Sequence, residues 1–321
     1  MSEMRKSFRS FIKNDLKEVE ALIKVALQPD ESIVSNESFD LYVTGGKKLR
    51  PTLSLLVGKL GAPEHYSSVL HTAASLELIH MASLVHDDII DDSSLRRNRE
   101  TTYYKHGYFQ AINTGNYLIS TSIRLVSDIH NPVFHKNYST MIKKIVTGEL
   151  FQFDTQFDDT QRLEDYYEKI YKKTALLIML SIELGAYAAH LDDTTRNNLT
   201  QFGYHVGMSF QIIDDCLDFI GTKKSLGKPS YTDLENGHYT LPVLLLRDRD
   251  ETFREMLRLY TKEQTNKEEL INYLLNTDAI DWAKDISDTY LDKALLDIED
   301  IKAPIKEYFI ELIEKLRTRL N

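Results

Sequence analysis

Apolar side chains recur along most of the chain at spacings of three and four residues, the period of an amphipathic α-helix. Residues 4–27 show the pattern first, with Phe8, Leu16 and Ile23 on one stripe, and Pro29 ends it. No run alternates convincingly between apolar and polar positions, as a strand would. The pattern predicts further helices over residues 51–60, from about 66, and over 108–129, 134–153, 162–189, 194–220, 265–275, 279–298 and 304–319.

Few signals interrupt this helical pattern. The chain has 13 glycines and 7 prolines in 321 residues, and no low-complexity linker divides it. Thr265 and Glu268 have the spacing of a capping box at the start of one predicted helix. We therefore expect an all-α fold in a single domain that spans residues 1–321.

One apolar stretch, residues 74–85, runs directly into Asp87, Asp88, Asp91 and Asp92. At helical spacing Asp87 and Asp91 share a face, with Asp88 beside them, and like charges at this spacing repel. A solvated acidic helix end is the simplest interpretation, but the preceding residues are too apolar for a surface helix. We interpret Asp87, Asp88 and Asp91, the first acidic motif, as a cation site at the mouth of a cavity.

The same arrangement recurs in residues 207–219, where an apolar helix runs into the second acidic motif, Asp214, Asp215 and Asp218. Two such motifs are much harder to obtain by chance than one. Carboxylates without His or Cys suit Mg²⁺, which fills its shell with water and phosphate oxygens. We predict that the two motifs face each other and hold a diphosphate between them through bridging Mg²⁺.

The overall charge and the cysteine count exclude several classes of protein. The net charge of −10 argues against a general nucleic-acid binder, so no nucleic-acid partner is expected. Cys216 is the only cysteine, which excludes a disulfide framework and a Cys-based metal site. No apolar run approaches 18 residues and the N-terminus lacks a signal-peptide core, so we expect a cytoplasmic location.

Basic residues gather in short clusters, at residues 45–51, at Arg96-Arg97 and at Lys172-Lys173. For the arginine pair two interpretations stay open. It either forms an ion-pair patch with the nearby aspartates or supplies bidentate phosphate ligands. The Gly- and Lys-bearing segment 221–242 follows the second acidic motif and is either a lid over an anion or a solvated connector.

Taken together, residues 86–93, Arg96-Arg97, Lys173-Thr174, 211–219 and 226–229 resemble the ordered motifs of the trans-isoprenyl diphosphate synthase family. The match extends over roughly residues 40–300. Residues 79–88 and 204–209 look most like the large catalytic components of bacterial heptaprenyl and hexaprenyl diphosphate synthases, two-component enzymes of menaquinone side-chain synthesis. The resemblance implies one isoprenoid synthase domain, a helical bundle around a central cavity.

The resemblance also implies roles for individual residues. The six aspartates of the two acidic motifs would bind Mg²⁺, three ions with substrate bound, and through it an allylic diphosphate such as farnesyl diphosphate. The allylic diphosphate would contact Arg96, Lys173, Thr174, Gln211 and Lys228, and isopentenyl diphosphate would contact Lys47, Arg50, His80 and Arg97.

The chemistry explains why such residues are needed. A diphosphate is a poor leaving group until cations neutralise the charge that develops as the allylic C–O bond breaks. The isopentenyl double bond then attacks the carbocation, and water must be excluded so that it does not intercept the cation. The resemblance therefore implies a prenyltransferase that adds isopentenyl units head-to-tail in all-trans geometry.

Product length depends on the helix before the first acidic motif. Ala82 and Ser83 lie five and four residues before Asp87, about one helical turn below the carboxylates. In the family, aromatic residues there stop growth early, so two small residues imply a longer product of about C30 to C40. Close helix packing is the alternative reason for small residues at these positions.

Several positions depart from the family pattern. Asn98 and Glu100 stand where Gly and Pro are usual, and Asn116 replaces a usual Asp. Tyr231 replaces Gly and His238 replaces Lys in the segment after the second motif. These changes leave the reaction class unaltered because both acidic motifs are intact.

Other functions remain as alternatives. A shorter-chain farnesyl or geranylgeranyl diphosphate synthase would use the same motifs. A terpene cyclase would need no isopentenyl site, which Lys47 and Arg50 argue against. A non-catalytic subunit would gain nothing from six retained, mutually repelling aspartates. We expect either a homodimer or a heterodimer with a small regulatory component.

Overall fold

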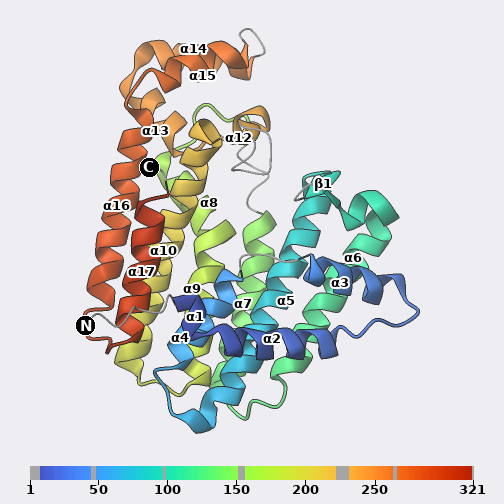
Figure 1. The fold of residues 1–321 in the computed structure, drawn as a ribbon. Coiled ribbons are helices and arrows are strands. Elements are labelled where there is room, and N and C mark those ends of the chain that lie inside the picture. Colours follow the sequence, from blue (N-terminus) through green and yellow to red (C-terminus); the bar gives the residue numbers. More distant parts are fainter. Residues whose placement is uncertain are drawn as a thin grey trace. The chain divides into compact units, whose positions relative to one another are not determined.

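A computed structural model describes residues 8–44, 48–96, 99–150, 156–221, 231–262 and 266–319, and it confirms the all-α fold (Figure 1). Within these residues the strands are β1 (Leu95–Arg96) and β2 (Arg99–Glu100), which pair as a short antiparallel hairpin. The chain clusters into two compact units. Unit 1 comprises residues 1–143, 177–203 and 297–311, and unit 2 comprises 144–176, 204–296 and 312–321.

Unit 1 is built around one apolar helix, α5 (Tyr66–Ile90), which begins at the predicted residue and ends in the first acidic motif. It packs along α6 (Thr102–Val126), as Figure 1 shows, and also against α2 and α4. The other elements of this part of the chain are α1 (Phe8–Phe11), α2 (Lys13–Ala26), α3 (Ile33–Val43), α4 (Leu49–Gly58), the 3₁₀ helix η1 (Pro63–His65), α7 (Pro132–Leu150) and α9 (Leu176–Ala188).

A glycine of α6 lies against a histidine of α5. A Cβ added at Gly115 would lie 2.1 Å from Nε2 of His86, so a side chain there would require the imidazole to move. Burial lowers the pKa of this imidazole, which favours its neutral form. Helix α6 bends at Gly107, whose φ of 79° few other residues adopt. The helix predicted from residue 108 begins six residues earlier, at Thr102.

Helix α10 (Asp193–Ile220) belongs to unit 2 from residue 204 onward. The core of unit 2 lies between this part of α10 and the helices that follow. Ser209 of α10 and Ser287 of α16 are joined by a buried hydrogen bond of 2.7 Å. The remaining elements are α8 (Leu163–Ile170), the π-helix η3 (Tyr171–Ala175), α12 (Thr232–Glu235), α13 (Leu241–Arg249), α14 (Glu251–Thr261), α15 (Lys267–Leu275), α16 (Ala279–Asp297) and α17 (Ile305–Arg317).

Several predicted boundaries were wrong. The predicted helix over 162–189 is three elements, because a π-helix at 171–175 separates α8 from α9. Helices α3, α12, α13 and α14 were not predicted. The side chain of Asn266 caps α15 by accepting a hydrogen bond from the backbone N–H of Glu269, and Thr265 lies outside the described residues.

One segment has the length and composition of a membrane-spanning helix. Among the described residues, 63–90 passes that test, although the sequence suggested no run of this kind. However, 67% of its most apolar window is buried inside the protein, as in the core helix of a globular domain.

Candidate functional site

The first acidic motif occupies the last turn of α5, with Ile90 as the final helical residue. Asp88 is buried, Asp87 is half-buried and Asp91 is exposed. Like charges so close repel, and the motif is followed at once by the hairpin that carries Arg96. The N–H of Ser93 donates to the Asp88 carbonyl over 2.9 Å and ties the start of the hairpin to the last turn of α5. The Thr101 hydroxyl donates to the Ser93 carbonyl over 2.7 Å and closes the hairpin.

Arg96 pairs with the buried member of this motif. Its Nε donates to Oδ1 of Asp88 over 2.6 Å. Burial raises the pKa of Asp88, and the guanidinium opposes that shift by stabilising the carboxylate. This contact supports the ion-pair interpretation of Arg96. It is also compatible with phosphate binding, because a guanidinium carries five N–H donors and this bond uses one.

The second acidic motif lies deeper in its unit. Asp215 is 3% exposed and Asp218 is fully buried, whereas Asp214 is half-buried and forms a 2.6 Å ion pair with Arg319. Burial raises the pKa of Asp215 to about 7, and the nearby negative charges of Asp233 and Asp214 add to the effect. A bound divalent cation would lower the pKa of Asp215 again, since it stabilises the ionised carboxylate.

Three side chains hold Asp215 in place. The phenol of Tyr166 donates to its Oδ2 over 2.7 Å, and Nε2 of Gln211 donates to its Oδ1 over 2.8 Å. The hydroxyl of Thr174 donates in turn to Oε1 of Gln211 over 2.5 Å. The structure therefore brings together Thr174, Gln211 and Asp215 from the predicted set and adds Tyr166.

The π-helix η3 contributes to this arrangement. It carries exposed Lys173 and buried Thr174, directly after α8, the helix of Tyr166. Short π-helical turns are rare inside helices and occur frequently at functional sites. The wider turn alters the direction in which Lys173 and Thr174 leave the helix.

The segment after the second acidic motif folds back onto it. The backbone N–H of Tyr231 donates to the Asp218 carbonyl over 3.1 Å, and the N–H of Asp233 donates to Oδ2 of Asp218 over 3.4 Å. Tyr231 has a φ of 66°, in the left-handed region that favours glycine. This conformation gives a physical reason for the family's usual glycine at this position.

Other predicted residues lie on α4 and α5 of unit 1. Arg50 lies in the first turn of α4 and His80 on α5, both half-buried. Ala82 is 1% exposed, and the Ser83 hydroxyl donates to the His80 carbonyl over 2.9 Å. The predicted ligands Lys47, Arg97 and Lys228 lie outside the described residues, as do Asn98 and most of the predicted lid, 222–230.

The donor set fits Mg²⁺ by its chemistry. Among the described residues, no three or more His, Cys, Asp or Glu side chains form a cluster that would hold a metal alone. Mg²⁺ does not require one, because it commonly takes one or two carboxylates together with water and phosphate oxygens. The two motifs belong to different units, and that they face each other stays a prediction.

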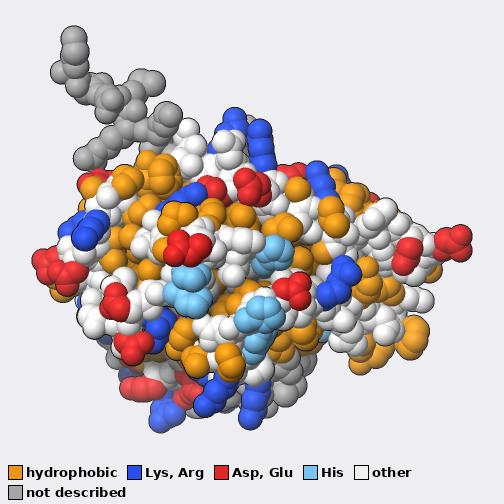
Figure 2. Space-filling model, turned by 90° about the horizontal axis from the view of Figure 1, so that it is seen from below, with side chains coloured by type: hydrophobic (Ala, Val, Ile, Leu, Met, Phe, Trp, Pro, Cys, Tyr) orange, Lys and Arg blue, Asp and Glu red, His pale blue; other side chains and the backbone are white. Residues whose placement is uncertain are grey.

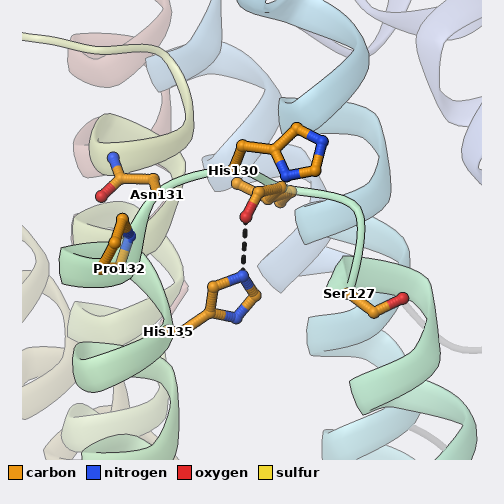
Figure 3. Close-up of a pocket in the computed structure, with 6 residues that line it drawn as sticks. Ser127, His130, Asn131, Pro132 and His135 are labelled. Carbon is orange, nitrogen blue, oxygen red and sulfur yellow. Dashed lines mark hydrogen bonds between the residues drawn. The ribbon is translucent and has the colours of Figure 1, made fainter.

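A cleft of about 470 Å³ elsewhere in unit 1 contains none of the predicted residues (Figure 3). It is lined by the turn between α6 and α7 and by Pro132 and His135 of α7, and two of its polar side chains have partners in this region. Nε2 of His135 lies 2.7 Å from the Ile129 carbonyl, and Oδ1 of Asn131 accepts from the first N–H groups of α7. On the face shown in Figure 2, acidic, basic, histidine and hydrophobic side chains are intermixed.

Sequence reasoning missed three residues around the second acidic motif, namely Tyr166, Asp233 and Arg319. Tyr166 precedes Lys173 by seven residues, or two helical turns, which is its only signal in the sequence. Asp233 and Arg319 reach the motif through tertiary folding alone.

The chain is similar to known proteins over most of its length. The Polyprenyl synthetase family profile matches residues 33–277. Component 2 of heptaprenyl diphosphate synthase from Geobacillus stearothermophilus is 40% identical over 90% of this chain and 91% of its own length.

Two solved structures are similar over nearly the whole chain. Heptaprenyl diphosphate synthase from Staphylococcus aureus has a TM-score of 0.89 and 38% identity, covering 97% of this chain and 99% of its own. A polyprenyl synthase from Caulobacter crescentus, complexed with calcium and isoprenyl diphosphate, has a TM-score of 0.87 and 28% identity, covering 98% and 99%.

Proposed function

Because the chain belongs to the polyprenyl synthetase family and is a trans-prenyl diphosphate synthase, we propose that it makes a product of about C30 to C40 with Mg²⁺. The family's substrates are isopentenyl diphosphate and an allylic diphosphate, and farnesyl diphosphate is the proposed primer. The observation that carries the proposal is the pair of acidic motifs, each with a buried carboxylate fixed by its own partners.

The proposed metal ligands are Asp87, Asp88 and Asp91 from the first motif, and Asp214, Asp215 and Asp218 from the second. Mg²⁺, when bound, supplies positive charge that makes the diphosphate a better leaving group. Support comes from the hard oxygen donors and from the calcium and isoprenyl diphosphate in the Caulobacter crescentus structure. Three ions are proposed, on the family resemblance.

The cationic side chains would stabilise the departing diphosphate. We assign Arg96 and Lys173 to the allylic diphosphate, with Lys228 as a third contact. The allylic C–O bond breaks and its electron pair leaves with the diphosphate. Preorganised cations then stabilise the developing negative charge without having to reorganise at that moment.

The second substrate completes the reaction. The isopentenyl double bond attacks the allylic carbocation to form the new C–C bond, and loss of a proton from the carbon next to the new cation restores a double bond. We assign Lys47, Arg50, His80 and Arg97 to its diphosphate. The diphosphate released in the first step is the proposed proton acceptor, because no isolated side chain has to be the base.

Product length and biological role are part of the same proposal. Small Ala82 and Ser83 leave room for a long tail along α5, and heptaprenyl diphosphate synthases are among the similar proteins. A role in menaquinone side-chain synthesis and one isoprenoid synthase domain over 1–321 follow from the resemblance, and a cytoplasmic location is proposed with them. The name "component 2" of two relatives supports a heterodimer with a small component, and a homodimer is the alternative.

An assay of products tests this function. The purified protein is incubated with Mg²⁺, isopentenyl diphosphate and farnesyl diphosphate, alone and with extract that supplies a second component. Products are then separated by chain length. We expect C30 to C40 diphosphates in at least one condition. Products that stop at C15 or C20 would favour the shorter-chain alternative, and no elongation in any condition would contradict the proposal.

A further inference from the structure

A lysine and a histidine form an unexpected pair beside the second acidic motif. Nζ of Lys169 lies 3.2 Å from Nδ1 of His238. The imidazole is 9% exposed and the lysine is half-buried. The sequence analysis gave no role to Lys169, and it regarded His238 only as a departure from a usual lysine.

The pair lies close to the residues that hold the motif. Tyr166 and Lys169 are three residues apart on α8, a spacing that makes them neighbours on one helix face, and Lys173 follows on η3. Tyr166 bonds Asp215 directly. Lys169 therefore lies along the helix between a residue that bonds the motif and a lysine assigned to the diphosphate.

The histidine is fixed by the segment that returns from the motif. Its backbone N–H donates to the Asp233 carbonyl over 2.7 Å, and the N–H of Asp233 donates to Asp218. The charge of Asp233 acts on both His238 and Asp215. His238 is thus linked to Asp218 through the backbone of Asp233, and the charge of Asp233 also acts on Asp215.

Charge determines how the pair is protonated. Burial, together with the positive charges of the Lys169 and Lys173 ammonium groups, lowers the pKa of His238 to about 4. At neutral pH the imidazole is therefore uncharged, and its Nδ1 accepts a hydrogen bond from the Lys169 ammonium. A lysine at position 238 would instead place a third ammonium near those of Lys169 and Lys173.

We propose that Lys169 is a diphosphate-binding residue at the second acidic motif, and that His238 is a positioning residue that holds its ammonium there. The inference rests on the proposed function, because it assigns a further contact to the same allylic diphosphate. In this chain the positive charge comes from α8, while the segment after the motif supplies a neutral acceptor.

Four variants test the pair, which are Lys169→Met, His238→Lys, the double variant with both changes, and Lys172→Met as the matched control. Lys172 is on the same stretch and pairs with Glu168 at 2.6 Å. The measurements are kcat/KM for farnesyl and isopentenyl diphosphates, the Kd of inorganic diphosphate with Mg²⁺, and the thermal midpoint.

Lys169→Met should lower kcat/KM for the allylic substrate by about 10- to 100-fold, as expected for loss of a charged hydrogen bond, and should weaken diphosphate binding similarly. The KM for isopentenyl diphosphate should change less than about threefold. The double variant should recover most of the loss, because its lysine at 238 restores the ammonium. Lys172→Met should resemble the wild type.

Equal effects of Lys169→Met and Lys172→Met would overturn the inference, as would a double variant no better than Lys169→Met. If Lys169→Met does not fold, Lys169→Arg replaces it as the test, because it keeps the charge. This variant should retain kcat/KM within about fivefold of the wild type. A loss as large as that expected for Lys169→Met would contradict the assignment. A wild-type protein that elongates no allylic substrate would instead remove the proposed function itself, so the two failures are distinguishable.

Discussion

Tyr166 donates its phenolic proton to Asp215 across 2.7 Å, although 49 residues separate the two in sequence. Tyr166 is 1% exposed, and burial, followed by the charge of Asp215, raises the pKa of its phenol. The phenol therefore stays protonated and acts as a permanent donor to the carboxylate. Groups that orient metal ligands in this way commonly contribute 10- to 100-fold to metal affinity or activity.

Replacing this phenol should weaken the site without changing its ligands. Tyr166→Phe should lower turnover about 10-fold and raise the Mg²⁺ concentration needed for half-maximal rate, because Asp215 loses a hydrogen bond that favours its ionised form. Tyr167→Phe removes a hydroxyl from the next residue and serves as control. A Mg²⁺ dependence that is the same in Tyr166→Phe and wild type would contradict this role.

The raised pKa of Asp215 predicts how stability depends on pH in the metal-free protein. A carboxyl whose pKa is about 7 when folded and 3.8 when unfolded binds more protons in the folded state. This group should therefore contribute its full stabilisation of the folded state below about pH 4. The contribution, and with it the free energy of unfolding, should fall as the pH rises toward 7. The pKa difference corresponds to roughly 4 kcal/mol as an upper limit.

Asp215→Asn should remove this dependence. Denaturant unfolding in excess chelator should show the variant more stable than wild type at pH 8, with a smaller difference at pH 4.5. Other titrating groups, such as His238, are common to both proteins and cancel in the comparison. Parallel pH curves for the two proteins would show that Asp215 does not titrate in this way.

Arg50 separates the two substrate sites. Arg50→Ala should raise KM for isopentenyl diphosphate about 10- to 100-fold, since hydrogen bonds to charged groups contribute about 1.5–3 kcal/mol. KM for the allylic substrate should change much less. Steady-state kinetics with each substrate varied in turn measure the difference. Equal effects on both KM values would show that the assignment of Arg50 to the isopentenyl diphosphate site is wrong.

Ala82 tests where the growing chain passes. Ala82→Phe should shift products toward C15 or C20 while largely keeping the rate of the first condensation, because a ring one turn below the first motif blocks the tail. Ala82 is buried, so the thermal midpoint must be measured as well: overpacking a filled core costs about 1–3 kcal/mol. Full-length products from a folded variant would show that the tail does not pass this position.

Long apolar helices were the easiest part of the fold to predict. Helices α5, α10 and α16 begin within one residue of the predicted positions, because each has an extended pattern that burial then selects. Helix α3 was missed because polar residues interrupt its short stretch. Helix α13 begins at Leu241-Pro242, and a proline in the first turn is a start signal that the sequence analysis did not use.

The candidate site was predictable in its residues more than in its contacts. Both acidic motifs stand at helix ends as expected, since their spacing is local. The hydrogen bond from Tyr166 to Asp215 was not predictable, because only the packing of α8 against α10 brings the two residues together. The π-helix at 171–175 was not predicted either, because the helical pattern over 162–189 gives no sign of a wider turn.

Metal-dependent elongation is the most direct test of the central claim that the two acidic motifs act through Mg²⁺. Incorporation of labelled isopentenyl diphosphate into farnesyl diphosphate is followed in excess chelator, after Mg²⁺ is restored, and in folded Asp87→Ala protein. Asp87 is suited to this test because it is half-buried in a repulsive cluster, so its loss should leave the fold intact or slightly stabilised without Mg²⁺. The account predicts no elongation in chelator, full recovery with Mg²⁺, and loss of most turnover in Asp87→Ala. Wild-type rates in chelator, or in the variant, would contradict it.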